Sequence, residues 1–86
     1  MIVERKNRDR RINALHTRIL ETLSDVYYMH GNEIYAWVHD DLPSPAIFLR
    51  YLEDLERLGY VRFDVENGYI RTRLGTEILR RTSLRT

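Results

Sequence analysis

Residues 44–74 limit the possible fold more than any other stretch, because a capped helix ends there directly before two short alternating segments. Ser44 is a favourable N-cap residue, and Pro45 suits the first helical position, where its missing N–H costs nothing. Gly59 supplies the left-handed backbone that commonly ends a helix. Apolar residues at helical spacing predict a buried stripe made of Phe48, Leu49, Leu52, Leu55 and Leu58.

The segments that follow Gly59 flank Asn67-Gly68, which is the strongest short-range signal for a β-hairpin. With Asn67 and Gly68 as the two turn residues, Arg62 would lie opposite Arg73. The predicted inner face consists of Val61, Phe63, Val65, Ile70, Thr72 and Leu74. The predicted outer face consists of Arg62, Asp64, Arg71 and Arg73. A helix followed directly by a hairpin is the second half of a winged helix-turn-helix domain.

The remaining segments fit the same fold. A one-sided apolar pattern predicts a first helix from Ile12 to about Ser24. Asn32 is expected to cap a second helix, with Ile34, Trp37 and Val38 facing the core. Thr72 is placed to cap a short last helix. The prediction is a mainly α chain with a small β-hairpin (α+β): a basic N-terminal arm (1–11), a winged-helix domain (12–82) and a C-terminal tail (83–86).

Composition restricts the function classes. The 86 residues contain no cysteine, which excludes disulfides, thiolate metal sites and cysteine nucleophiles. No apolar run approaches the length of a membrane span and no signal peptide is recognisable, so a cytoplasmic protein without membrane contact is expected. The net charge of +1 hides a partition, because residues 21–66 hold ten carboxylates against three arginines whereas both ends are basic. Such asymmetry often accompanies nucleic-acid contact.

Three segments resemble the PadR-like winged-helix regulators of transcription. The first is His30-Gly31-x-Glu33-Ile34, at the start of the second helix. The second contains Leu52, Leu55, Gly59 and Val61, a pattern that MarR-like winged helices share. The third contains Thr72, Gly75 and Leu79. The resemblance covers residues 19–79 and implies a dimeric, DNA-binding regulator of transcription, such as a repressor.

A winged helix places its third helix in the major groove and its hairpin along the phosphate backbone, which makes three groups of residues candidates for DNA contact. The recognition helix offers Ser44, Ala46, Ile47, Arg50 and Tyr51. The hairpin offers Arg62, Arg71 and Arg73, and the arm offers Arg5, Lys6, Arg8, Arg10 and Arg11. Arg50 can hold guanine through two hydrogen bonds. A phosphate would relieve the repulsion between Arg62 and Arg73.

Each of these groups has a second interpretation. The hairpin arginines can extend into solvent or pair with the acidic third helix of a partner chain, and the arm can serve only as a solubilising tail. Glu53, Asp54 and Glu56 would repel phosphates if they faced the groove, although Asp54 could instead pair with Arg50. The alternative function is therefore a protein-binding adaptor or inhibitor that docks through Ile47, Tyr51 and nearby aromatic residues, without DNA contact.

Most of the aromatic residues are expected in the core or at a homodimer contact: Tyr27, Tyr28, Tyr35, Trp37 and Tyr51. No enzyme is predicted, because the chain has no nucleophile motif and no Gly-rich phosphate loop. The histidines at 16, 30 and 39 lack metal-binding spacing, so neither a metal nor a cofactor is expected. The two hypotheses are sequence-specific binding of double-stranded DNA by a homodimer, and protein binding by an adaptor.

Overall fold

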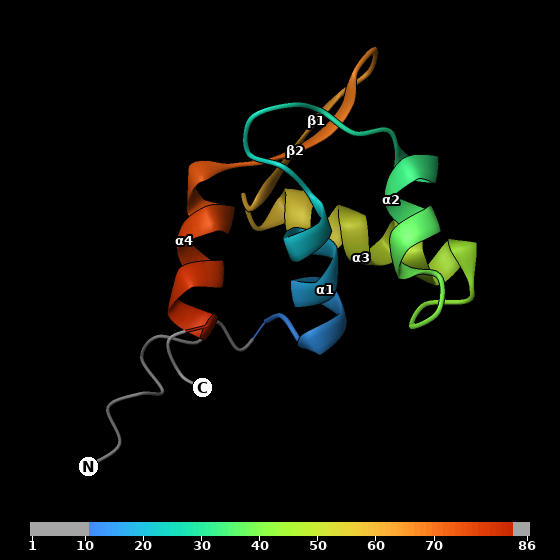
Figure 1. Cartoon of the computed structure of the whole chain (residues 1–86), viewed down its shortest axis with the longest axis horizontal. Coiled ribbons are helices and arrows are strands. Elements are labelled where there is room, and N and C mark those ends of the chain that lie inside the picture. The colour runs from blue at the N-terminus through green and yellow to red at the C-terminus, as the bar shows by residue number, and fades with distance from the viewer. Residues whose placement is uncertain (1–10, 84–86) are drawn as a thin grey trace.

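The computed structural model describes residues 11–83, which form helices around one core and a single projecting hairpin (Figure 1). In chain order the elements are α1 (Ala14–Thr22), α2 (Gly31–Val38), α3 (Pro45–Arg57), β1 (Val61–Asp64), β2 (Gly68–Arg71) and α4 (Arg73–Ser83). The predicted mainly helical α+β class is confirmed for this part of the chain. In Figure 1, α1 stands between α2 and α4, α3 crosses behind it, and the hairpin extends away from the helices.

The core is formed where the first three helices meet the base of the hairpin. Its most deeply buried side chains come from α1, α2 and α3: Ile19, Leu20, Ile34, Val38, Leu52 and Leu55. Tyr60 and Val61 add the start of the hairpin, and Ile78 adds α4. Burial of these side chains is the main source of stability in a domain this small.

Helix α3 begins and ends where the sequence predicts. Ser44 Oγ accepts the Ile47 N–H at 3.4 Å, and Gly59 has a φ of 87° after the helix. Phe48, Leu52 and Leu55 form the buried stripe. The prediction that Leu49 joins this stripe is wrong, because its side chain is 49% exposed. Successive helical residues are rotated by about 100°, which moves Leu49 from the buried side of α3 to its surface.

The hairpin register differs from the prediction by three residues. The observed pairs are Val61 with Arg71, Arg62 with Ile70, Phe63 with Tyr69 and Asp64 with Gly68. The cause is a three-residue loop, 65–67, in which the Asp64 carboxylate accepts the backbone N–H groups of Glu66 and Asn67 at 3.0 and 2.8 Å. Gly68, with a φ of 104°, then follows the loop as its left-handed residue.

An odd shift in register exchanges the faces of the hairpin. Val61, Phe63, Tyr69 and Arg71 now share one face, and Arg62 and Ile70 share the other. Phe63, Val65 and Leu74, which were predicted in the core, are all exposed. Val65 is 85% exposed because it lies in the loop and has no partner on the opposite strand.

The segment before α2 runs along the free edge of β2. Met29 and Tyr69 exchange two backbone hydrogen bonds, of 2.8 and 2.7 Å, and the Arg71 N–H donates to the Ser24 carbonyl at 2.9 Å. A Cβ atom on Gly68 would lie only 2.3 Å from the Met29 carbonyl oxygen. The hairpin is therefore fixed to the α1–α2 connection as well as to α3.

Two predictions for α2 need correction. The helix is capped by His30, whose backbone N–H donates to Glu33 Oε1 at 2.8 Å, and not by Asn32. Ile34 and Val38 are fully buried as expected, but Trp37 is 67% exposed. Trp37 is rotated by about 100° from Val38, which directs its ring away from the core. At α4, Thr72 Oγ1 accepts the Gly75 N–H at 3.1 Å, which confirms the predicted cap.

Candidate functional site

The exposed side of α3 carries two arginines and one carboxylate in a single row. We call this row the outward stripe; it consists of Ala46, Arg50, Glu53 and Arg57, all of which are exposed. Arg50 has no polar partner among residues 11–83. Ile47 and Ser44 lie at the start of the helix, exposed and half-buried respectively. The outward stripe is one surface of α3 that is open to a large ligand.

Arg71 does not belong to an exposed basic surface, which corrects its assignment as a DNA contact. Its Nη1 donates to the carbonyl oxygens of Leu20 and Leu23, each at 2.8 Å, and its Nε donates to Thr76 Oγ1 at 2.9 Å. Its Nη2 lies 3.9 Å from the Asp25 carboxylate. Carbonyls at the end of a helix lack partners within the helix, and a cation there also favours the helix dipole. Arg71 therefore completes the C-terminal end of α1.

The predicted face of three arginines is absent because the register differs. Arg62 lies opposite Ile70, and Arg73 is the first residue of α4. Both side chains are exposed, without a polar partner among the described residues. The like-charge pair across the strands therefore does not form. Of the hairpin candidates, Arg62 and Arg73 remain accessible.

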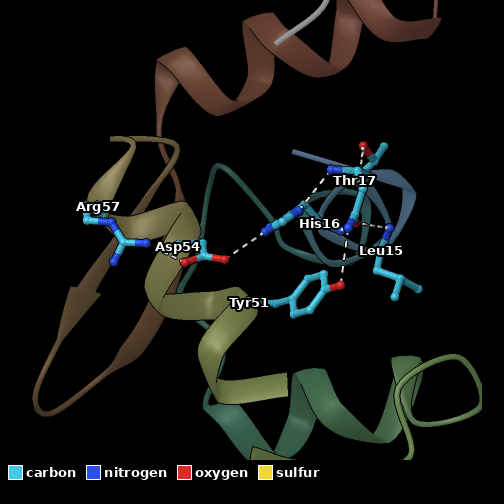
Figure 2. A network of polar contacts seen from close by, with 7 residues as sticks. Leu15, His16, Thr17, Tyr51, Asp54 and Arg57 are labelled. Atoms are coloured by element: carbon cyan, nitrogen blue, oxygen red, sulfur yellow. Dashed lines mark hydrogen bonds and ion pairs between the residues drawn. The ribbon is translucent and has the colours of Figure 1, made fainter. Parts of the chain in front are cut away.

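A polar network joins the first turn of α1 to α3 (Figure 2). Asn13 caps α1, since its Oδ1 accepts the N–H groups of Leu15 and His16 at 2.9 and 3.1 Å. The Asn13 N–H donates to His16 Nδ1 at 3.0 Å, and Asn13 Nδ2 donates to the Tyr51 hydroxyl at 3.2 Å. The rings of His16 and Tyr51 pack with their centroids 4.3 Å apart. Tyr51 is therefore half-buried and only partly accessible to a ligand.

His16 is the residue of this network that sequence reasoning missed. It is 5% exposed, and its Nε2 lies 3.1 Å from Asp54 Oδ2. Because Nδ1 accepts the Asn13 N–H, the proton of the neutral ring is on Nε2 and is donated to Asp54. The local signal was present in the sequence: a histidine stands three residues after an asparagine N-cap, at the position of a capping-box partner.

Asp54 is held by α1 and not by Arg50, which corrects the predicted pairing. The hydrogen bond from His16 lowers the pKa of Asp54 most strongly, burial opposes that effect, and Arg57 lowers the pKa further. The carboxylate is thus turned towards α1 and bound on both sides. Asp54 contributes little repulsion to a ligand on the outward stripe.

The hairpin side of α3 is acidic and partly apolar. Burial raises the pKa of Tyr69, and the nearby charges of Glu56 and Glu53 raise it further. The ring of Phe63 packs against Tyr69 with a centroid distance of 4.8 Å. This second surface, between α3 and the hairpin, combines the charges of Glu53 and Glu56 with the exposed ring of Phe63 beside Tyr69. Leu49 is exposed on α3 one turn before Glu53.

The basic arm falls mostly outside the described residues. Arg5, Lys6, Arg8 and Arg10 are not described, whereas Arg11 is exposed at the start of the described chain. From there the chain enters α1 at Asn13, which contacts Tyr51 on α3.

Neither a metal site nor a membrane span is found in residues 11–83: no three His, Asp or Glu side chains gather there, and no helix is long and apolar enough to cross a membrane. No family model, curated protein or solved structure matches the chain. The geometry of α3 and the hairpin therefore provides the basis for a functional proposal.

Proposed function

We propose that this chain is a winged helix that binds double-stranded DNA with α3 as its recognition helix. The order of three helices, a hairpin and a fourth helix is compatible with that fold. The observation that carries the proposal is the outward stripe, where Arg50 is exposed and unpaired among the described residues. Arg57, which is paired with Asp54, follows seven residues later, about 10.5 Å along the helix, and can reach the same groove if that exposed pair opens.

The exposed residues divide into base and backbone contacts. Arg50 reads guanine through a bidentate pair, and Ala46 and Ile47 contact thymine methyl groups. The N-terminus of α3 favours a phosphate through the helix dipole and the Ala46 N–H, since Pro45 has no N–H and the Ile47 and Phe48 N–H groups are bonded to Ser44. Arg62 and Arg73 contact the backbone on either side, and the arm adds further phosphate contacts. The resemblance to PadR-like regulators favours a homodimer, with two copies of α3 about 34 Å apart on the duplex.

A second candidate, a protein-binding adaptor, is favoured by the surface between α3 and the hairpin. Phe63 is exposed against Tyr69, whose pKa the nearby charges of Glu56 and Glu53 raise, and Leu49 is exposed one turn before Glu53 on α3. An apolar surface with carboxylates suits a partner protein better than a phosphate backbone. In this function the arginines of the outward stripe would lie at the rim of a protein interface.

Fluorescence anisotropy of the full chain with a mixed-sequence duplex separates the two functions. We expect binding at about 50 mM salt that weakens at least tenfold at about 200 mM, because each neutralised phosphate releases counterions. Absence of binding at the lower salt would contradict the DNA function and favour the adaptor.

The role of Arg50 has its own test. Once a preferred sequence is selected, Arg50→Ala should lose about 1–3 kcal/mol of binding free energy and relax the preference at one base pair. Arg81→Ala removes an exposed arginine from α4 and is the matched control. Equal weakening on all sequences would show that Arg50 contacts only phosphate.

A further inference from the structure

A hollow of about 350 Å³ lies on the side of α1 opposite to α3. We call it the aromatic hollow; it is lined by Arg18, Glu21, Thr22, Tyr27, Met29 and Trp37. The α1 residues of this hollow lie roughly half a turn around the helix from His16, which faces α3. The aromatic hollow is thus separate from the outward stripe and from the surface between α3 and the hairpin.

The aromatic side chains at this hollow are exposed to solvent. Tyr27 is 63% exposed, Trp37 is 67% exposed, and Val26 next to them is also exposed. Arg18 holds the end of α2 that carries Trp37. Its Nη2 donates to the Trp37 carbonyl oxygen at 2.9 Å, and its Nε donates to Asp41 Oδ2 at 2.9 Å. Exposed aromatic residues with a polar tip are enriched in protein interfaces, where they contribute large contact areas.

The lining of the hollow holds one carboxylate, Glu21, and one cation, Arg18, which is already bound to Asp41. Residues 21–41 contain no lysine or arginine and five carboxylates: Glu21, Asp25, Glu33, Asp40 and Asp41. Arg18 binds Asp41 and Arg71 lies near Asp25, which leaves the other three without an arginine. Glu21 lines the hollow and has no polar partner among residues 11–83. Because Arg18 is neutralised by Asp41, the Glu21 carboxylate leaves the lining with a net negative charge, which favours a cationic partner.

We propose that the aromatic hollow is a docking site for an arginine-rich segment of a partner protein. A guanidinium is weakly hydrated and can stack on an aromatic ring while it donates hydrogen bonds to a carboxylate. Tyr27 and Trp37 supply the rings, and Glu21 supplies the carboxylate. Because the hollow lies across α1 from α3, a partner can occupy it while α3 is bound to another molecule.

The experiment uses the full chain and synthetic octa-arginine, with octa-glutamate as the reference peptide. Trp37 is the only tryptophan, so its emission reports directly on the hollow. We expect a saturable change in emission with octa-arginine, weaker at higher salt, and none with octa-glutamate. If Trp37 emission does not change up to about 1 mM octa-arginine, any binding is weaker than about 4 kcal/mol, and the proposal is overturned.

Variants distinguish a specific site from general attraction. Tyr27→Ala and Glu21→Gln should each lower the affinity for octa-arginine about threefold or more. Tyr27→Ala removes a cation–π contact, and Glu21→Gln removes the unpaired carboxylate. Glu66→Gln makes the same charge change in the exposed hairpin loop and should leave the affinity unchanged. Equal weakening by Glu66→Gln and Glu21→Gln would overturn the proposal.

Amide chemical-shift mapping locates the peptide without any substitution. The largest changes should fall on Thr22, Met29 and Trp37, which line the hollow. Largest changes at Glu53 and Glu56 would place the peptide on α3 and would also overturn the proposal.

Discussion

His16 and Arg71 show how single side chains hold distant parts of this chain together. His16 receives a hydrogen bond from the cap of α1 and donates one to Asp54 on α3. Arg71 extends from the hairpin to the last carbonyls of α1. The sequence indicates the contact of His16 with its own cap, but neither the contact of His16 with α3 nor that of Arg71 with α1. Both contacts depend on which residues the tertiary fold brings together.

The Asp54 carboxylate predicts a specific loss of stability in acid. Folding lowers its pKa, so its contribution is complete above the ordinary value of 3.8 and is lost as the pH falls through the lower folded value. Asp54→Asn should lower the free energy of unfolding by about 0.5–1 kcal/mol at neutral pH, the range for a partly exposed pair. It should also make the loss of stability below pH 3.8 less steep than in the unchanged chain. Urea unfolding across this range measures both effects. Asp40→Asn is the exposed control, and an equally steep decline in Asp54→Asn would contradict the assignment.

The inward position of Arg71 predicts a large difference between two neighbouring arginines. Arg71→Met leaves several half-buried acceptors without their donor and should lower the free energy of unfolding by about 2–4 kcal/mol. Arg73→Ala, an exposed arginine two residues later, should change it by less than about 0.5 kcal/mol. Thermal unfolding of both variants provides the comparison. Similar losses in the two variants would be incompatible with the hydrogen bonds of Arg71.

At the scale of elements, the sequence predicted what local chemistry decides. The bounds of α3 follow from Ser44, Pro45 and Gly59, all of which act within a turn of their own position. The register of the hairpin could not be predicted in this way. It depends on the Asp64 side chain, which closes a three-residue loop, and on the contact of Gly68 with Met29. Leu49 and Trp37 were wrongly predicted to be buried. The spacing of apolar residues fixes the buried side of a helix only to within about 100°, the rotation from one residue to the next.

The attachment of the hairpin to the α1–α2 connection can be tested at Gly68. In Gly68→Ala the alanine must adopt a positive φ, and its methyl group lies against the Met29 carbonyl. The free energy of unfolding should therefore fall by about 1–3 kcal/mol. Amide exchange at Met29 and Tyr69 should accelerate, because their backbone hydrogen bonds must shift. Glu66→Ala in the same loop is the control and should leave exchange unchanged. Unaltered exchange in Gly68→Ala would contradict the close approach.

The whole molecule presents two chemically different faces on either side of α1. The outward stripe carries Arg50 and Arg57, and the aromatic hollow carries Tyr27, Trp37 and an unpaired carboxylate. The partition of charge along the sequence predicted only contact with nucleic acid. The sequence could not predict this arrangement, because it placed Trp37 in the core.

Assembly is predicted at this scale as well. If the DNA function holds, the homodimer implied by the family resemblance should place two chains on one duplex. Sedimentation velocity over a hundredfold concentration range, with and without duplex, measures the stoichiometry. We expect two chains per duplex of about 20 base pairs, since half-sites lie one helical turn apart. A single bound chain at saturation would contradict the dimer.

The contact between Arg71 and α1 also has a consequence for biosynthesis. The guanidinium that satisfies the Leu20 and Leu23 carbonyls comes from 51 and 48 residues further along the chain. While the nascent polypeptide is still on the ribosome, α1 therefore emerges long before the residue that completes its end. Short helices are marginal on their own, so α1 should become stable only after the hairpin has been synthesised. Folding of this domain should consequently be nearly all-or-none, and should begin only once Arg71 has been synthesised.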